Sequence, residues 1–385
     1  MPSMPYLYID SDQQLADFCH DIETAEYCAV DTEFVREKTY YPILALIQIA
    51  NEQHMACIDP LAINDFTPLI DLMGRQNLTK VFHSPSQDLE ILFQHFSQVP
   101  RPVFDTQLAA AVLGYNHQIG YADLVHQITG VKLDKKHTRA DWLKRPLSKE
   151  ELDYAMDDVR YLLPLYQQLK ADLVEKRRST WIEKDLQAMS STASYEINLT
   201  DLWKRLKGVQ KLKGVQMQIA SKLCQWREQL AQKKNRPRRW IAKDDRLIEI
   251  ARLQPASIED LSSIRELNEK FIAQHGQSIL KIIRDAQNMT PSEWPHPDRV
   301  ISLSSHQQAI GDCMTALCRV IAEDNQIALA TLATRKDIDN LIIDRKNSRL
   351  SQGWRFALAG ERLLEFIHGQ SVLGVLDDQI EISPR

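Results

Sequence analysis

The sequence has few cysteines, and no two of them stand in a C-x-x-C spacing. The six that occur are scattered along the 385 residues: Cys19, Cys28, Cys57, Cys224, Cys313 and Cys318. This scatter argues against a zinc knuckle and against a disulfide framework of the kind that small secreted proteins use. Reduced thiols are typical of cytosolic proteins, so we expect a cytoplasmic location.

Long apolar runs are also missing. No stretch approaches the ~20 consecutive apolar residues that a membrane-spanning helix needs. The first ten residues, M-P-S-M-P-Y-L-Y-I-D, lack the charged and apolar regions of a signal peptide. We therefore expect no membrane partner. The hydrophobic content of 44% and charged content of 26% are those of a globular protein, and the length predicts two or three domains.

The net charge of −5 is distributed unevenly. Residues 1–170 contain 14 Lys and Arg against 24 Asp and Glu, whereas residues 204–290 contain 19 against 9. An acidic first part followed by a basic middle part indicates a polyanionic partner. We expect the basic part to hold that polyanion while the acidic part, once metallated, acts on it.

The first part of the chain predicts an α/β domain. Stretches rich in Ile, Leu, Val and Tyr at 25–34, 41–50 and 54–59 predict three successive strands. Helices are then predicted at 63–74, 86–96 and 106–113, alternating with short strands at 78–83 and 103–105. This order predicts a mixed sheet with flanking helices.

A further helix is predicted to begin at Ser148. Ser148 and Glu151 have the spacing of a capping box, and Leu147 can pack against Leu152 as a hydrophobic staple. Pro164 is expected to kink or break this helix after its third turn.

The rest of the chain predicts two all-α domains. We expect the first domain to span 1–200, with 171–202 as a connecting segment, followed by helical domains at 203–288 and 298–385. A proline-rich stretch at 288–299 reads as the linker between them. The sequence L-C-R-V-I-A-E at 317–323 echoes L-C-Q-W-R-E-Q at 223–229, so the last domain is predicted to be a degenerate repeat of the middle one.

Acidic residues in three predicted elements suggest a metal site. Asp31 and Glu33 lie two apart at the end of a predicted strand, which places both on one face. Asp88 lies in the first turn of a predicted helix, and Asp158 lies one turn after Tyr154 on another. Such a cluster suits Mg²⁺ or Mn²⁺, which prefer oxygen ligands. For Asp31 and Glu33 alone, two solvated acids at a strand end remain an alternative.

These motifs resemble a known family. V-D-T-E-F at 30–34, H-x-x-x-x-D-L at 83–89 and Y-x-x-x-D-V-x-Y-L at 154–162 resemble the three motifs of the DEDD 3′→5′ exonucleases with tyrosine in the third. D-W-x-x-R-P-L at 141–147 and the two helical blocks are similar to ribonuclease D. R-P-R-R-W-I-A-K-D-D-R-L at 236–247 resembles the helicase-and-RNase-D C-terminal (HRDC) domain.

The resemblance implies a fold, a site and an activity. The fold is a ribonuclease H-like exonuclease domain followed by two HRDC-type domains. The resemblance implies that four residues bind two Mg²⁺ or Mn²⁺ ions: Asp31, Glu33, Asp88 and Asp158. It also implies that Tyr154 and Glu33 are catalytic. Tyr154 would contact the attacking water, as a neutral hydroxyl because the pKa of an ordinary tyrosine is near 10. The implied activity is 3′→5′ trimming of structured RNA, with tRNA precursors as substrates and nucleoside 5′-monophosphates as products. We also expect the protein to be a monomer.

Some assignments stay open at this stage. Asp157 lies near the same helix face as Asp158, and geometry alone does not exclude it as the ligand. We interpret Glu90 and Asp105 as surface or helix-capping acids. His83 is interpreted as a hydrogen-bonded residue at a strand end, with a place at the mouth of the site as the alternative.

The segment 233–240 contains five Lys and Arg and a tryptophan. It is predicted to be a basic loop whose Arg236, Arg238, Arg239 and Trp240 contact RNA, since an indole can stack on a base. A solvated helix connection is the alternative. For the whole protein, a 3′→5′ DNA exonuclease and a non-catalytic RNA-binding module are the alternative functions.

Overall fold

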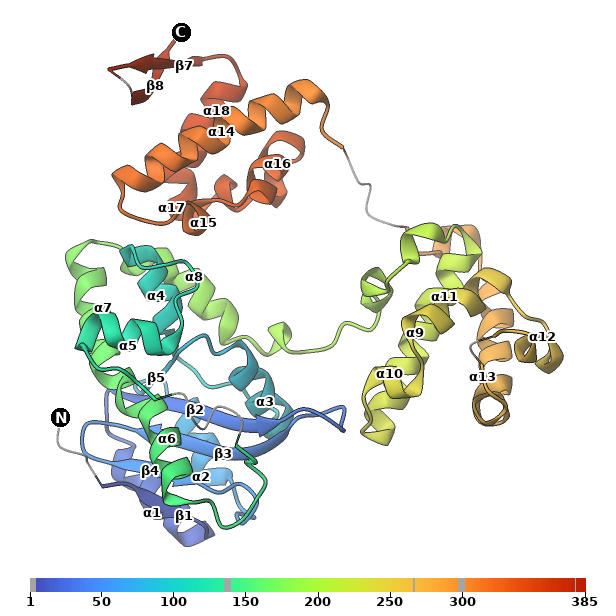
Figure 1. The fold of residues 1–385 in the computed structure, drawn as a ribbon, viewed down its shortest axis with the longest axis horizontal. Helices are drawn as coiled ribbons and strands as arrows, with labels where there is room; N and C mark the ends of the chain where they lie inside the picture. The colour runs from blue at the N-terminus through green and yellow to red at the C-terminus, as the bar shows by residue number, and fades with distance from the viewer. Residues whose placement is uncertain (1–4, 135–139, 266, 297–301, 378) are drawn as a thin grey trace. The chain divides into compact units, whose positions relative to one another are not determined.

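The computed structural model describes residues 5–134, 140–265, 267–296, 302–377 and 379–385. The chain divides into two compact units, which are described separately. The first unit comprises Met1–Phe34, Leu44–Tyr195 and Ile301–Arg385, and the second comprises Val35–Ile43 and Glu196–Val300. Figure 1 shows the elements of each along the chain.

A six-stranded sheet forms the centre of the first unit. Its strands are β1 (Leu7–Ile9), β2 (Tyr27–Val35), β3 (Ile43–Ala50), β4 (Met55–Ile58), β5 (Thr79–Phe82) and β6 (Val103–Asp105). They lie in the order β1-β4-β3-β2-β5-β6. The pair β3–β4 is antiparallel, whereas β1–β4, β2–β5 and β5–β6 are parallel. The predicted mixed sheet is confirmed, and β2 lies in its interior.

Helices cover both faces of this sheet (Figure 1). One face packs on α1 (Asp12–Ile22), α2 (Thr67–Gly74) and α3 (Ser86–Phe96). The other packs on α4 (Thr106–Leu113), α5 (Tyr121–Thr129), α6 (Lys149–Arg160), α7 (Leu162–Glu175) and α8 (Ser179–Met189). Strand β2 contributes to both cores, because its successive side chains point to opposite faces: Cys28 and Val30 face α1–α3, and Ala29 faces α4–α8.

Helix α6 begins and ends where the sequence predicts. The Ser148 hydroxyl accepts from the Glu151 N–H, and the Glu151 carboxylate accepts from the Ser148 N–H, which completes the capping box. The helix ends at Arg160, and α7 starts two residues later. Pro164 accounts for the break, because it has no N–H to donate to the carbonyl of Arg160 four residues earlier.

The second unit contains the helices that follow the connecting segment. These are α9 (Val215–Lys234), α10 (Arg238–Ile241), α11 (Asp244–Leu253), α12 (Ile258–Ser262) and α13 (Glu269–Gln287). The predicted basic loop at 233–240 is wrong in extent: α9 continues through Lys234 and α10 starts at Arg238. Only Asn235–Pro237 connect them, where Asn235 ends α9 in the left-handed conformation. The linker predicted at 288–299 contains a 3₁₀ turn at Pro291–Glu293, and its residues 297–299 lie outside the described residues.

The last part of the chain forms a separate helical core within the first unit. Its elements are α14 (Ser305–Asp324), α15 (Leu329–Leu332), α16 (Arg335–Ile343), α17 (Gly353–Arg355), α18 (Glu361–Ile367) and an antiparallel hairpin of β7 (Ser371–Leu376) and β8 (Gln379–Pro384). Helices α9 and α14 are both 20 residues long, and each buries the cysteine of the echoed motif, Cys224 or Cys318. The hairpin was not predicted from sequence.

This helical core packs directly against the sheet-containing part of the same unit. The indoles of Trp181 and Trp354 stack with their centroids 4.3 Å apart. The guanidinium of Arg178 donates to the carbonyls of Val112 and Asn325, both at 2.7 Å. The division into three domains stays a prediction, since the structure groups 301–385 with the sheet.

Candidate active site

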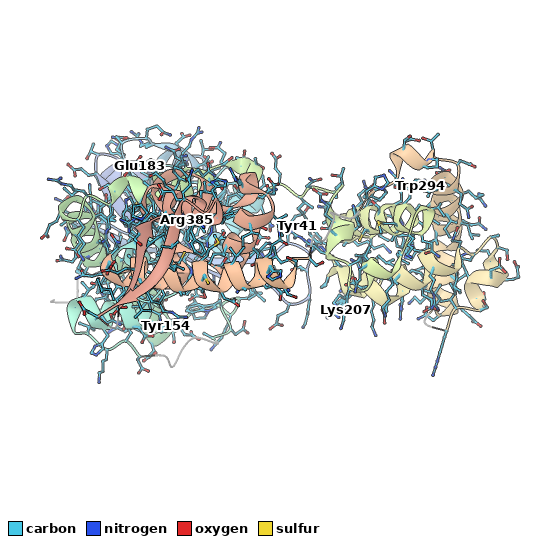
Figure 2. All side chains as sticks on the ribbon, turned by 90° about the horizontal axis from the view of Figure 1, so that it is seen from above. Tyr41, Tyr154, Glu183, Lys207, Trp294 and Arg385 are labelled. Atoms are coloured by element: carbon cyan, nitrogen blue, oxygen red, sulfur yellow. The ribbon has the colours of Figure 1, made fainter. Side chains whose placement is uncertain are left out.

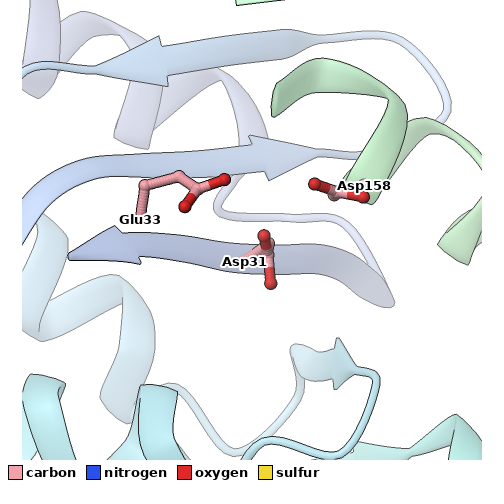
Figure 3. A group of neighbouring side chains, drawn as sticks. All are labelled: Asp31, Glu33 and Asp158. Carbon is pink, nitrogen blue, oxygen red and sulfur yellow. The ribbon is translucent and has the colours of Figure 1, made fainter. Parts of the chain in front are cut away.

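Strand β2 places Asp31 and Glu33 on the face that α6 covers. Both follow Ala29 at even spacing, so they share its side of the sheet. The intervening Thr32 points to the opposite side, toward α3. Figure 3 shows the carboxylates of Asp31 and Glu33 on this strand, close to Asp158 on α6. The strand therefore separates two acids on one face from the hydroxyl on the other.

Helix α6 supplies the third carboxylate. Oxygen atoms of Asp31, Glu33 and Asp158 all lie within 4.8 Å of one another. The neighbouring Asp157 instead pairs with Arg160 on the same helix. The structure thus groups Asp158 rather than Asp157 with the acids of β2.

Asp88 approaches from α3. Its Oδ1 accepts a hydrogen bond of 2.5 Å from the Thr32 hydroxyl, which fixes the carboxylate beside β2. Its charge acts on Asp31, Glu33 and Asp158 strongly enough to raise the pKa of each. Asp88 therefore lies beside the three-carboxylate group, although its oxygens are not among those within 4.8 Å of one another.

The four acids have raised pKa values. Burial is the largest cause for each of them. It raises the pKa of Asp31 well above its usual range, with the charges of Asp88, Asp158 and Glu33 next in importance. The pKa of Glu33 is raised to about 8 and that of Asp158 to about 7. Converging, partly buried carboxylates that repel one another form a donor set suited to hard divalent cations. The residues therefore fit such a metal.

Tyr154 lies one turn before Asp158 on α6. Its ring stacks on the indole of Trp142, with centroids 6.3 Å apart and planes at 30°. Trp142 is buried, with 4% of its surface exposed. Figure 2 labels Tyr154 among the side chains of the first unit.

Comparison with known proteins assigns this chain to a family. A family model described as 3′-5′ exonuclease matches residues 6–174, and an HRDC domain model matches 216–283. Ribonuclease D of Zymomonas mobilis is 35% identical over 374 residues, which cover 96% of this chain and 96% of that protein. The chain belongs to the ribonuclease D family.

Further relatives agree with this assignment. Ribonuclease D of Sphingobium indicum is 34% identical over 97% of this chain and 98% of that protein. The crystal structure of Escherichia coli RNase D matches 95% of this chain and 99% of that chain, with a TM-score of 0.85 and 30% identity. As a ribonuclease D family member the chain is a 3′-5′ exoribonuclease. The family assignment thus favours the exoribonuclease over the two alternatives, a DNA exonuclease and a non-catalytic RNA-binding module.

Three other candidates from the sequence have local structural roles. His83 Nδ1 lies 2.9 Å from the Thr106 hydroxyl and Nε2 lies 3.1 Å from the Ile119 carbonyl, and burial lowers the pKa of this imidazole to about 4. Asp105 caps α4 by accepting from the N–H of Gln107. Glu90 accepts from the Gln94 side chain one turn along α3.

Tyr121 and Trp142 also lie at the ribonuclease D site, although the sequence predicts no role for either. Tyr121 on α5 donates its hydroxyl to the carbonyl of Asp157, in the last turn of α6, where helix carbonyls lack intrahelical partners. Burial raises the pKa of this phenol, and the carboxylates of Asp158 and Asp31 come next as causes, which places the phenol beside the site. Trp142 belongs to the D-W-x-x-R-P-L motif, but the motif alone does not show that its indole meets Tyr154.

The basic cluster, defined as Arg236, Arg238, Arg239 and Trp240, lies in the second unit. Arg238 donates to Glu228 at 2.6 Å, and its guanidinium lies over the ring of Tyr40. Arg239 is exposed, as is the indole of Trp240, which shows 58% of its surface and lies under the guanidinium of Arg236. Within the described ranges, no helix is both long and apolar enough to cross a bilayer.

The acidic cluster is defined as Asp31, Glu33, Asp88 and Asp158. Its pKa shifts predict how the free energy of unfolding of the metal-free protein depends on pH. In the folded state Glu33 holds its proton up to about pH 8 and Asp158 up to about pH 7. In the unfolded chain both carboxyls release their protons near the ordinary pKa values of Glu and Asp. Since the folded state binds more protons, stability falls as pH rises through this window. We expect the melting temperature in EDTA to fall between about pH 5 and about pH 8.

The control is Asp31→Asn, which removes a carboxyl whose own pKa is raised well above its usual range by burial and by its acidic neighbours, so one proton-binding group is lost. Its melting temperature in EDTA should fall less steeply over the same pH range. Adding Mn²⁺ to the unmodified protein should raise the melting temperature most at the upper end of the range. A melting temperature in EDTA that stays constant or rises with pH would contradict the electrostatic account of the site.

Proposed function

We propose that this exoribonuclease trims the 3′ ends of structured RNAs, with tRNA precursors as the substrate class, and releases nucleoside 5′-monophosphates. The support for structured RNA comes from the E. coli relative, which is described as an exoribonuclease involved in structured RNA processing. The basic charge of 204–290 and the HRDC match at 216–283 suit a part that holds the body of such an RNA.

The observation that supports this chemistry is the convergence of Asp31, Glu33 and Asp158 beside Asp88, with Tyr154 one turn from Asp158. We infer that these four carboxylates hold two divalent ions, Mg²⁺ or Mn²⁺. When bound, such ions stabilise the charge that develops on the attacking and leaving oxygens of a phosphodiester. When all four carboxylates are ionised they carry about four negative charges, which two divalent ions would offset.

The protein's own groups position the reacting water. Hydrolysis forms a bond from the water oxygen to the terminal phosphorus and breaks the bond to the 3′ oxygen of the preceding nucleotide, which leaves with a proton. We assign Tyr154 to orient that water through its neutral hydroxyl, and Glu33 to assist from the opposite element of the site. Tyr154 suits this role because α6 fixes its backbone and Trp142 restricts its ring.

The direct test is stepwise shortening of end-labelled RNA. A 5′-labelled hairpin with a short 3′ tail, a tRNA precursor and a DNA of matched sequence would be compared in Mg²⁺, in Mn²⁺ and in EDTA. We expect shortening of the RNA tails from the 3′ end, arrest at the base-paired stem, loss of activity in EDTA, and nucleoside 5′-monophosphates as products. Internal cleavage or unchanged activity in EDTA would refute the proposal.

Replacing a proposed ligand should abolish turnover without unfolding the protein. Asp31→Asn keeps the side-chain shape but replaces a carboxylate by a neutral amide, which is a poor ligand for a hard cation. We expect loss of nucleolysis at saturating Mg²⁺ with an unchanged circular dichroism spectrum. The matched control is Asp312→Asn, a surface acid of the same unit that pairs with Arg335. Near-normal turnover of Asp31→Asn would remove this residue from the ligand set.

Removal of the Tyr154 hydroxyl should slow the chemical step. Tyr154→Phe retains the ring that stacks on Trp142 but can no longer orient water, and a positioned group of this kind contributes roughly 10²–10⁴ in rate. We expect kcat to fall by about that factor while the Mn²⁺ concentration for half-maximal activity stays the same. A large rise in that Mn²⁺ concentration would instead assign the hydroxyl to metal binding.

The exposed part of the basic cluster should contribute to RNA affinity. Each phosphate contact contributes about 0.7–0.9 to the slope of log affinity against log salt. In an Asp31→Asn background, which leaves the RNA intact, Arg236→Ala with Arg239→Ala should flatten that slope by up to about 1.8. The control pair is Arg252→Ala with Lys281→Ala, which removes two charges of the same unit that are already ion-paired. Equal slopes for both pairs would show that the basic cluster does not contact phosphate.

A further inference from the structure

Arg145, in the D-W-x-x-R-P-L motif, uses all five of its N–H donors. Its Nε donates to Asp59 Oδ2 at 2.6 Å, and Nη2 donates to Asp59 Oδ1 and to the Ala45 carbonyl, both at 2.7 Å. Its Nη1 donates to the carbonyls of Trp142 and Lys144, both at 2.8 Å. A planar guanidinium with every donor engaged has one orientation, which lysine cannot reproduce.

Asp59 anchors Arg145 to the sheet through the paired bonds from Nε and Nη2, which we call the fork. It follows β4 directly, shows 4% of its surface, and also accepts from the Tyr8 hydroxyl at 2.6 Å and from the Leu61 N–H at 3.0 Å. The side-chain hydrogen bonds from Arg145 and Tyr8 outweigh burial and lower its pKa, so it stays ionised. Arg145 therefore joins the segment before α6 to two strands, through Asp59 after β4 and through Ala45 on β3.

The segment held in this way carries Trp142. Arg145 holds the Trp142 carbonyl directly, and the buried indole lies against the ring of Tyr154. On the other side of Arg145, Leu147 is buried in the core and Ser148 caps α6. The position of Tyr154 is thus set both by its helix and by the indole of Trp142. The backbone of Trp142 is in turn bonded to Arg145, which is fixed to the sheet.

We propose that Arg145 and Asp59 are positioning residues for Tyr154 and that they act through Trp142. Neither residue touches the acidic cluster in the contacts described above. Their effect on turnover would come from the placement of the Tyr154 hydroxyl, where an error of about 1 Å can cost about 10² in rate. The inference rests on the proposed role of Tyr154 in orienting the attacking water.

The test is a double-mutant cycle between Arg145→Lys and Tyr154→Phe in the full-length protein. Arg145→Lys retains the positive charge but loses the fork to Asp59 and the bonds to the carbonyls. We expect it to lower kcat on a short single-stranded RNA by about 10–100-fold, with KM and the Mn²⁺ concentration for half-maximal activity unchanged. In the Tyr154→Phe background the same substitution should cause no further loss, because the hydroxyl that it misplaces is already absent.

The matched control is Arg349→Lys. Arg349 forms a similar fork with Asp337, at 3.0 and 2.7 Å, in the helical core of the same unit. We expect Arg349→Lys and Arg145→Lys both to lower the melting temperature, but Arg349→Lys should leave kcat unchanged. Trp142→Phe provides a second test if Arg145→Lys folds poorly. It leaves the bonds between Arg145 and Asp59 in place, and its smaller ring makes less contact with the ring of Tyr154. It should show the same lack of additivity with Tyr154→Phe.

The outcomes separate the inference from the function on which it rests. If Tyr154→Phe turns over normally, the proposed role of Tyr154 fails and the positioning role fails with it. If Tyr154→Phe is slow but Arg145→Lys and Trp142→Phe lower kcat by the same factor in both backgrounds, Tyr154 keeps its role and the positioning inference is overturned. A raised Mn²⁺ requirement in Arg145→Lys would also overturn it, because the substitution would then act on Asp158.

Discussion

The repulsion among four partly buried carboxylates is the constraint on which the site depends. Burial, and after it the charges of neighbouring carboxylates, raise the pKa of Asp31, Glu33 and Asp158, so the arrangement opposes folding unless protons or cations are bound. The surrounding structure resists this repulsion by placing the acids on rigid elements. Strand β2 lies inside the sheet, and α6 has a complete capping box at its start. Thr32 and Tyr121 add hydrogen bonds to Asp88 and to the last turn of α6.

The D-W-x-x-R-P-L motif gains a physical explanation from these contacts. Its tryptophan stacks on Tyr154, its arginine joins the segment to two strands, and its leucine enters the core just before α6 begins. None of these residues is a candidate metal ligand. The motif instead fixes the entry to the helix that bears both Tyr154 and Asp158, so a substitution within it can alter catalysis without touching the acids.

The basic region shows why a count of charges overstates the number of residues available to a ligand. Arg238 is engaged by Glu228, which shows only 2% of its surface, and by the ring of Tyr40. Asn235 accepts from the backbone N–H groups of Tyr40 and Tyr41. Helix α9 and the residues after it therefore hold the 35–43 segment within the second unit. Arg236, Arg239 and Trp240 are the exposed members of the basic cluster that remain available for the proposed RNA contact.

The sequence by itself determined the features that depend on local periodicity and capping. The period of two along β2 put Asp31 and Glu33 on one face, and the helical period put Tyr154 and Asp158 one turn apart. The capping box and Pro164 marked the two ends of α6. Only the tertiary structure decided which acid joins the cluster, because Asp157 is diverted to Arg160. It also decided that Arg145 reaches Asp59 and that Arg178 reaches Asn325, 86 and 147 residues away in the chain. No local pattern encodes such pairs, since they form only when distant segments pack together.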